Sequence, residues 1–412
     1  MTENFHNKIA KLCIDHFQNL PKTGKPTAKE WTILSCIVKE NTIAHHLEVV
    51  ALGTGSKCIG KSRLSPKGDI LNDSHAEIIC RRAFLRYIYD QLNKIFTFNK
   101  NTARFHLDNS IKFHFFTTHV PCGDAAIFPK QDFNEFGDAI ETDLSIASPN
   151  GNLKRPADGD INVKNKQTKG DIYRTGAKCL PGETKQDLHV KGLEFHTTGA
   201  VRTKPGRGDP TLSVSCSDKI AKWCHLGVQG ALLSILLEKP LYLTSFTISA
   251  QTQFCINALE RALYDRFDTI EMKSPYRLNK MMLGQASSIG FEFSKVESKQ
   301  PCPSSIAWCK INSRPLEVAV EGKKQGITKK KQNTKSCRLQ ISKIELFRSF
   351  LTTIEKNRNL FNLFGNIKLS ELQYGVAKSN AKEYQEMWTN LKLKHFKLWT
   401  VKDSALLQFV VD

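Results

Sequence analysis

The chain has 412 residues, 40% hydrophobic and 24% charged, so it can bury a large core and has the composition of an ordinary globular protein. Lys and Arg number 60 against 40 Asp and Glu, and the formal net charge of +20 favours a polyanionic partner such as nucleic acid. The simpler alternative is a soluble basic protein. Met1–Phe5 has no signal-peptide pattern and no segment could span a membrane, so a secreted disulfide scaffold is excluded. We therefore expect the cytosol or the nucleus, with the twelve cysteines as free thiols or metal ligands.

In the first half of the chain, the sequence predicts a helix, a strand, a second helix and a second strand, in that order. Residues 1–50 are interpreted as a helical region because apolar residues recur at helical spacing, namely Ile9, Leu12, Cys13 and Phe17. A strand is predicted at His46–Leu52, an amphipathic helix at Ser74–Leu92 and a Phe-rich strand at Ile111–Val120. Residues 130–171 are polar and rich in turn formers, which is typical of a flexible insertion.

The second half continues to alternate helices with strands. Helices are predicted at Ser217–Leu237, Phe254–Phe267, Ile341–Asn357 and Ser379–Leu393, and a strand at Leu241–Ser249. A lysine-rich loop at Lys323–Lys335 is either solvated or in contact with phosphate. The alternation predicts an α/β layered domain over residues 50–410, with residues 1–49 as an N-terminal helical extension packed on it.

His75 and Glu77 form an H-x-E pair at the start of a predicted helix, and Pro121-Cys122 follows where a strand ends. This combination is typical of zinc-dependent deaminases, in which His and Cys bind the metal and Glu transfers protons. The structural alternative is a helix capping box, because Ser74 and Glu77 have its spacing. Ala125 occupies the position of the second cysteine in the usual P-C-x-x-C motif, so a third ligand must come from elsewhere.

Cys216 is the best candidate for that third ligand. It precedes a predicted helix, and a helix N-terminus stabilises the thiolate that zinc requires. One imidazole and two thiolates leave a fourth zinc position for water, which is typical of a catalytic site and not of a structural one.

Three blocks, Asn72–Arg82, Pro121–Ala125 and Ser215–Ala221, resemble the adenosine deaminase domain of RNA-editing enzymes and occur in that family's order. The resemblance runs from about Val50 to Phe409. It implies a cytidine-deaminase-like fold, with a mixed central sheet flanked by helices and a helical C-terminal part. It also implies that His75, Cys122 and Cys216 bind Zn²⁺, while Glu77 moves protons during the hydrolysis of adenosine to inosine.

Only about fifty residues precede this region, too few for the double-stranded-RNA-binding modules of some family members. We therefore expect the branch of the family that acts on tRNA. The resemblance implies an anticodon-loop adenosine as substrate, position 37 of alanine tRNA, with no obligate protein partner. The alternatives are editing of double-stranded RNA and a catalytically inactive RNA-binding module.

Cations recur on helical stripes that otherwise face a core, beginning with Arg81 and Arg82 beside Ile78 and Leu85. Each side chain could extend along apolar surface to solvent, but a buried polyanion explains the set better. The resemblance implies inositol hexakisphosphate, with lining positions at Asn72, Ile78, Arg81, Arg82, Ser213, Lys219, Lys222, Lys343, Tyr374, Lys378, Tyr384, Trp399 and Lys402.

The remaining positive charge is expected to face RNA. By resemblance, Ser56 and Lys57 approach the substrate backbone. Arg202, Lys204 and Arg207 are predicted to lie in a flexible cationic loop suited to phosphate contact, although an ordinary solvated loop is equally consistent with the sequence.

Overall fold

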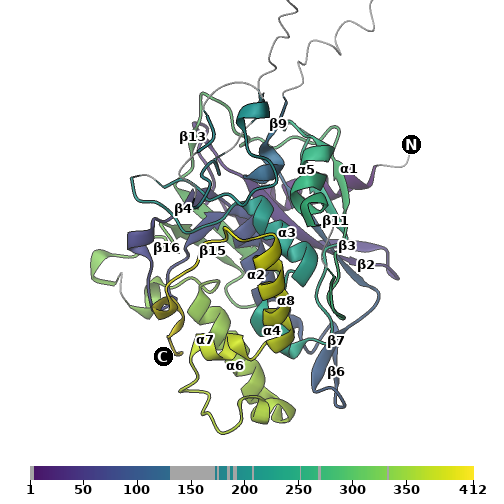
Figure 1. Cartoon of the computed structure of the whole chain (residues 1–412), viewed down its shortest axis with the longest axis vertical. Helices are drawn as coiled ribbons and strands as arrows, with labels where there is room; N and C mark the ends of the chain where they lie inside the picture. The colour runs from purple at the N-terminus through teal and green to yellow at the C-terminus, as the bar shows by residue number, and fades with distance from the viewer. Residues whose placement is uncertain are drawn as a thin grey trace, which may run out of the picture.

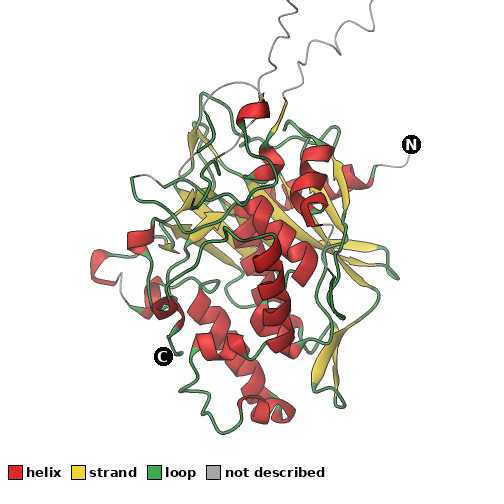
Figure 2. Cartoon of the chain, viewed as in Figure 1, coloured by secondary structure: helices red, strands yellow, loops and turns green. Residues whose placement is uncertain are grey.

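A mixed β-sheet runs through the middle of the molecule, with helices packed on both of its faces (Figures 1 and 2). The computed structural model describes residues 4–129, 172–173, 176–182, 186–188, 193–206, 208–250, 252–267, 271–331 and 334–412. Within these residues the sheet has eight strands in the order β12-β11-β8-β2-β3-β14-β15-β16. Their bounds are β2 Leu34–Asn41, β3 His46–Thr54, β8 Ile111–Thr117, β11 Ser245–Ile248, β12 Met282–Gln285, β14 Ser304–Cys309, β15 Leu316–Val320 and β16 Lys323–Lys324.

Strands β12, β11 and β8 are parallel, whereas β8, β2, β3, β14, β15 and β16 pair antiparallel in turn. The predicted α/β fold with a mixed central sheet flanked by helices is therefore confirmed. The helices are α1 Phe5–Asn19, α2 Ala76–Gln91, α3 Cys216–Leu226, α4 Ala231–Leu236, α5 Ile256–Leu263, α6 Lys343–Lys356, α7 Tyr374–Ser379 and α8 Lys382–Lys394. Figure 1 shows α2, α3 and α8 in front of the sheet and α6 and α7 at the lower end of the molecule.

The two faces of the sheet bury two separate cores, because successive side chains of a strand point in opposite directions. On β2, Cys36 and Val38 pack into the smaller core with Phe17 of α1. Ile37, between them, packs into the larger core with Phe84 of α2. The larger core continues into the C-terminal helices, so the sheet and the helical C-terminal part share one apolar interior.

Two expectations from the sequence are wrong in this region. The helical prediction for residues 1–49 is correct for α1, but residues 34–41 form β2, a strand between β8 and β3. The predicted helix Ser217–Leu237 is divided into α3 and α4. The break includes Gly230, whose φ is +76° and where a Cβ would lie 2.4 Å from Nη2 of Arg81. The break therefore lets the Arg81 guanidinium reach the backbone, where its Nε donates to the Val228 carbonyl at 2.8 Å.

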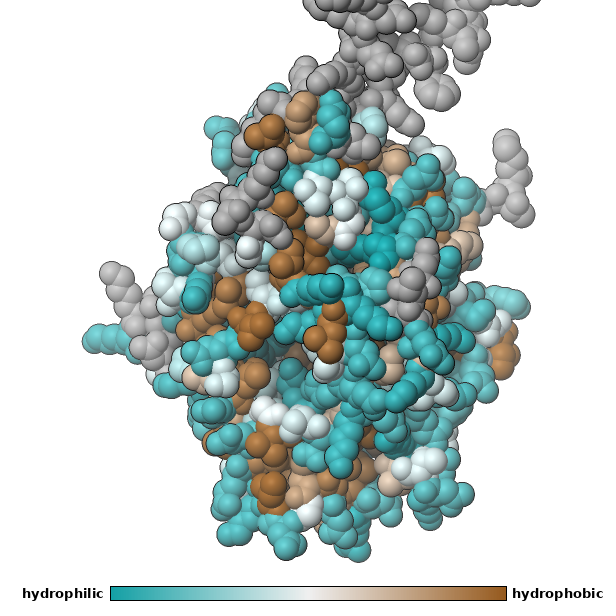
Figure 3. All heavy atoms as spheres, viewed as in Figure 1, coloured by the Kyte–Doolittle hydropathy of each residue, from teal (hydrophilic) through white to brown (hydrophobic). Residues whose placement is uncertain are grey.

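Residues 130–171, predicted as a flexible insertion, lie outside the described residues. Among the described helices, none combines the length and the apolar character needed to cross a lipid bilayer. The face of the molecule in Figure 3 is mainly hydrophilic, and its hydrophobic residues lie in separate patches.

Gly53 lets the start of α2 approach β3. A Cβ at Gly53 would lie 2.4 Å from the backbone nitrogen of Cys80 and 2.5 Å from the carbonyl oxygen of Ala76. Neither backbone atom can move away without displacing α2, which carries the residues that follow His75. The glycine is thus required by close packing of a helix on a strand.

We expect Gly53→Ala to lower the free energy of unfolding by about 1–3 kcal/mol, because the added methyl group overpacks a rigid contact. Chemical denaturation monitored by circular dichroism measures the loss. Gly176→Ala is the control, since a Cβ there meets no atom within 4 Å. Equal stability of the Gly53 and Gly176 variants would contradict the packing argument.

Candidate metal centre and buried cation cluster

The three predicted metal ligands lie on segments far apart in the chain, and the structure brings two of them, Cys122 and Cys216, into contact. His75 ends β5 (Asp73–His75) and directly precedes α2, Cys122 follows β8, and Cys216 is the first residue of α3. The backbone N–H of Cys216 donates to the Cys122 sulfur at 3.4 Å, and the N–H of Ser217 donates to the Cys122 carbonyl at 3.1 Å. The amino end of α3 therefore faces Cys122, which stabilises negative charge on its sulfur.

The electrostatics of the two cysteines favour a thiolate at this position. Hydrogen bonding to Cys216 lowers the pKa of Cys122 to about 6, with Lys204 and His75 adding to the effect against burial. Burial and the neighbouring Cys122 and Glu77 raise the pKa of the Cys216 thiol. Lys204 offsets part of this rise, because its Nζ lies 3.1 Å from the Cys216 sulfur. Negative charge is therefore favoured on Cys122 and disfavoured on Cys216.

Asp73 orients the imidazole of His75. Its Oδ1 lies 2.8 Å from His75 Nδ1, while its Oδ2 accepts from Lys204 at 2.9 Å and from Lys219 at 2.5 Å. Burial by itself would raise the pKa of Asp73, but Lys204, Lys219 and His75 hold it well below its usual range. Because Nδ1 is occupied by the carboxylate, Nε2 is the nitrogen that remains to bind a metal.

A second donor set is present beside the first one. Ligand atoms of Cys58, Asp73 and His75 lie within 4.8 Å of one another. The Asp73 carboxylate, however, already accepts hydrogen bonds from two lysines and from His75, so a divalent cation there would meet two ammonium groups. We therefore interpret Asp73 as the group that orients the His75 ring.

Glu77 does not cap α2, and its carboxylate is buried. Its side chain is buried, and Oε2 has no hydrogen-bond partner. The residue at the N-cap of α2 is His75, and no side chain caps this helix end. The capping-box alternative is therefore wrong. A buried carboxylate oxygen without a partner is costly, which is typical of an atom that meets a substrate or a water molecule.

An aspartate two residues after each cysteine anchors its segment. Asp124 accepts from Arg261 of α5 at 3.2 Å, and Asp218 accepts from Arg266 at 2.7 Å. Both carboxylates are fully buried. Arg266 lies in the short 3-10 turn Asp265–Phe267 that follows α5, so adjacent elements hold both cysteine-bearing segments in place.

The thirteen residues predicted to bind a polyanion line two adjoining cavities, of about 240 and 250 Å³. The cavities share Arg81, Arg82, Lys222, Lys343 and Tyr384. Asp73 is the one carboxylate among the residues that line them, against seven cationic side chains. The structure therefore brings together positions that are more than 300 residues apart in the chain, from Asn72 to Lys402.

The fold disfavours the charged form of several lysines and arginines that line these cavities. Burial, followed by Lys402 and Arg82, lowers the pKa of Lys343 to about 7. Burial and Lys219 lower the pKa of Lys402 to about 8, and burial lowers that of Arg82 to about 10. Lys222 Nζ lies 3.4 Å from the ring centroid of Trp388, a cation–π contact that compensates part of its burial. Lysine pKa values that burial and neighbouring cations lower this far are typical of a site that binds an anion.

Comparison with known proteins then identifies the family. The family model described as adenosine-deaminase (editase) domain matches residues 51–403. The chain belongs to the adenosine-deaminase (editase) family. Among similar proteins, tRNA-specific adenosine deaminase 1 of Drosophila melanogaster is 40% identical over 411 residues, covering 98% of this chain and 96% of that protein. The Homo sapiens protein of the same name is 34% identical, covering 95% of this chain and 97% of that protein. Double-stranded RNA-specific adenosine deaminase of Mus musculus is 29% identical, covering 92% of this chain but 30% of that protein.

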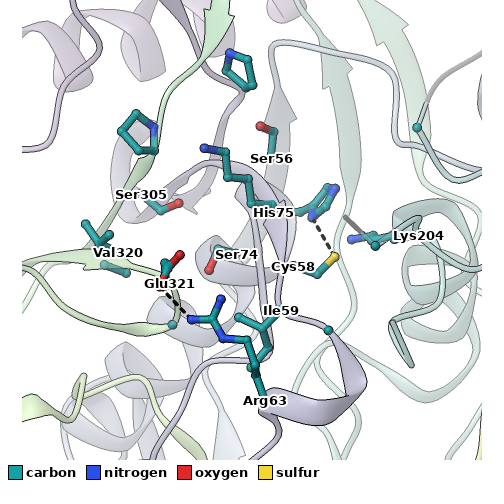
Figure 4. Close-up of a pocket in the computed structure, with 18 of the residues that line it drawn as sticks. Ser56, Cys58, Ile59, Arg63, Ser74, His75, Lys204, Ser305, Val320 and Glu321 are labelled. Atoms are coloured by element: carbon teal, nitrogen blue, oxygen red, sulfur yellow. Dashed lines mark hydrogen bonds and ion pairs between the residues drawn. The ribbon is translucent and has the colours of Figure 1, made fainter. Parts of the chain in front are cut away.

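A pocket of about 500 Å³ in this deaminase is lined by His75 and Cys58, whereas Cys122, Cys216 and Glu77 are not among its lining residues. Figure 4 shows Ser56, Ser74 and His75 around it, with Lys204 to the right of His75 and the Arg63–Glu321 ion pair at the lower left. Lys57 lines the same pocket. The two residues predicted to approach RNA from this turn therefore lie beside the metal ligand, since Ser56 pairs with His75 across β4 (Ser56–Cys58) and β5.

The prediction that Arg202 and Lys204 contact phosphate from a flexible loop is wrong. The Arg202 side chain is buried and pairs with Asp187 at 2.5 Å. Lys204 is buried between Asp73 and the Cys216 sulfur. Both cations pair with carboxylates that are close in space but 15 and 131 residues away in the sequence. The basic run therefore indicated the wrong role, because these partners are not visible beside it in the sequence. Arg207 lies outside the described residues.

Sequence reasoning assigned no role to Asp73, although the D-x-H spacing contained the signal. Residues two apart on a strand lie on the same face, so the side chains of Asp73 and His75 on β5 are necessarily neighbours. The lysine partners of Asp73 could not be predicted in this way, because Lys204 is 131 residues away in the sequence.

We expect Asp73→Asn to destabilise the deaminase by about 3–5 kcal/mol, because it leaves two buried lysines without their counter-charge. Urea unfolding measures the change. The control Asp15→Asn removes an exposed partner of Lys11 on α1 and should cost less than about 1 kcal/mol. An Asp73→Asn variant as stable as this control would show that the carboxylate is not needed by its partners.

Proposed function

We propose that this deaminase hydrolyses adenosine to inosine in tRNA, with Zn²⁺ held by His75, Cys122 and Cys216 and with Glu77 as the proton-transferring residue. The observation that carries the proposal is the buried Glu77 carboxylate, whose Oε2 has no partner, beside two converging cysteine sulfurs. The relatives named tRNA-specific match this chain over nearly their whole length, which supports tRNA as the substrate.

The donor set fits zinc. One imidazole with its Nδ1 held by a carboxylate, together with two thiol groups of which one has a pKa of about 6, makes a three-ligand site with room for water. When bound, the metal would supply Lewis acidity that lowers the pKa of a water molecule. Asp73 keeps the imidazole in one orientation, and Lys204 stabilises negative charge on Cys216.

Glu77 would carry the protons of the reaction. Its carboxylate takes a proton from the attacking water, whose oxygen forms a bond to C6 of adenine. It then protonates the ring nitrogen and finally the departing amine, so that adenosine and water give inosine and ammonia. Burial makes this efficient, because a carboxylate shielded from bulk water exchanges its proton with the substrate.

The adenosine at position 37 of alanine tRNA, beside the anticodon, is the proposed target. A base in an anticodon loop is unpaired, so extracting it costs less than flipping a base out of a duplex. Incubation of the purified protein with total tRNA, followed by mapping of new inosines, tests this choice. A long RNA duplex is the comparison substrate, and preferential turnover of the duplex would instead favour double-stranded RNA editing.

We expect Glu77→Gln to abolish turnover, reducing the rate by at least about 100-fold, because the amide cannot accept the water proton. Folding and zinc content should stay near those of the wild type. Glu317→Gln, a buried carboxylate of β15 that accepts from the Gln340 N–H at 2.7 Å, is the matched control and should keep activity. Inosine formation and metal analysis measure both outcomes. Normal turnover by Glu77→Gln would refute the assignment.

We further propose that the cation cluster binds inositol hexakisphosphate. The thirteen predicted lining residues include seven cations, two tyrosines and a tryptophan around a buried space, which suits a compact polyphosphate. A bound polyanion would restore the charged state of lysines that burial and mutual repulsion oppose.

The stability of the anion-free protein is expected to rise with pH between about 7 and 10. Lys343 and Lys402 have pKa values of about 7 and 8 in the fold and near 10.5 when unfolded. The unfolded state therefore binds more protons in this window, which makes the pH dependence positive. Added inositol hexakisphosphate keeps these lysines charged, so it should flatten the rise and raise Tm most near neutral pH.

Scanning calorimetry at several pH values, with and without the polyanion, measures this effect. Lys343→Met should reduce both the pH dependence and the gain from the polyanion, whereas Lys382→Met, an exposed lysine of α8, should change neither. Identical pH profiles with and without the polyanion would contradict binding at this cluster.

A further inference from the structure

The pocket that contains His75 has a polar and an apolar part. The polar lining includes Ser74, His75 and Lys204. Another part of its lining is apolar and comes from Trp31, Pro301 and Pro303. The backbone links the two parts: the Gly55 N–H donates to the Ile33 carbonyl at 3.1 Å, and Ser56 pairs with His75. Trp31 and His75 therefore both line this pocket and lie on segments that are hydrogen-bonded to the Gly55–Ser56 segment, Trp31 two residues before Ile33.

Trp31 differs from the other four tryptophans, all of which lie in the described part of the chain. Trp223 is buried in the larger core, Trp388 and Trp399 pack against that core, and Trp308 packs against the smaller one. Trp31 belongs to neither core and is partly exposed in the pocket wall. Packing therefore does not account for a large aromatic side chain at this position.

The backbone of Trp31 is held firmly even though its ring is not packed in a core. Strand β1 (Glu30–Trp31) pairs in parallel with β13 (Gln300–Pro301), and the Cys302 N–H donates to the Trp31 carbonyl at 2.9 Å. Lys295 Nζ lies 5.7 Å from the centroid of the indole ring, and this lysine is exposed. The ring is thus presented from a fixed strand with a cation next to it.

The arrangement matches the chemistry of an unpaired nucleotide. A nucleobase stacks on a flat aromatic ring without regard to its identity, and its phosphate pairs with nearby cations. Lys295 is the cation next to the ring, and the pocket itself is lined by Arg63, whose ion pair with Glu321 is 2.7 Å long but exposed on both sides. Such an exposed pair contributes little, so Arg63 can exchange Glu321 for a phosphate at small cost.

We propose that Trp31 stacks on the unpaired base next to the adenosine being deaminated, and that this contact makes the enzyme select single-stranded loops. In a duplex, a neighbouring base remains paired and stacked within the helix and is not free to reach Trp31. The proposal rests on the proposed function, because it names how the RNA substrate is chosen. Trp31 acts in it as a specificity residue that does not touch the reacting atoms.

Turnover of the tRNA substrate by Trp31 variants is the first test. Trp31→Ala and Trp31→Leu should lower kcat/KM by about 5- to 150-fold, which is the loss expected for one base–aromatic stack. Trp31→Phe keeps a stacking surface and should recover most of the activity. Trp308→Phe, a tryptophan on the α1 side of the sheet that contacts His16, should leave kcat/KM unchanged. Values within twofold of wild type for both non-aromatic variants would overturn the proposal.

Stacking itself can be observed without turnover. An anticodon stem-loop carries 2-aminopurine at the nucleotide before or after the target adenosine, and its fluorescence falls when the base stacks. We expect quenching at one of these positions with wild type and Trp31→Phe, and loss of that quenching with Trp31→Ala at saturating protein. Equal quenching by wild type and Trp31→Ala at both positions would overturn the proposal. If the wild type forms no inosine in tRNA, the proposed function fails instead, and the two failures are distinguishable.

Discussion

The Asp73 carboxylate is the group on which both buried sites depend. One oxygen holds His75, and the other accepts from Lys204 and Lys219. Lys204 lies against the Cys216 sulfur, while Lys219 lines the cation cavities. In a low-dielectric interior a charged group is stable only when all its partners are in place, because an unpaired one costs several kcal/mol. The candidate metal centre and the cation cluster therefore share one electrostatic support.

The geometry around this support is produced by close backbone contacts and buried ion pairs. Gly53 brings the start of α2 onto β3, which positions His75 and Glu77 at one end of the sheet. Arg261 and Arg266 hold the aspartates that follow Cys122 and Cys216. The candidate site is thus built on rigid elements, with each predicted metal ligand supported by a neighbouring charged residue.

The sequence predicted elements well where one face is apolar and the other polar. The periodicity of α1 is such a case, since Ile9, Cys13 and Phe17 are all buried against the sheet. Strand β2 was missed because Leu34–Val38 is buried on both sides of the sheet, and a short continuous apolar run does not distinguish strand from helix. Arg202 was assigned to RNA because nothing near it in the sequence indicates that Asp187 would enclose it.

The sequence by itself determined the chemical groups of the site: a histidine and a glutamate two residues apart at the start of a helix, two cysteines before helical turns, and an excess of cations on apolar stripes. Only the tertiary structure decided which of those cations are buried, which carboxylate they share, and which tryptophan faces the pocket. The physical reason is that ligand type is a property of single residues and short spacings. Burial and ion pairing depend on contacts between segments such as Asp73 and Lys204, which meet only when the chain has folded.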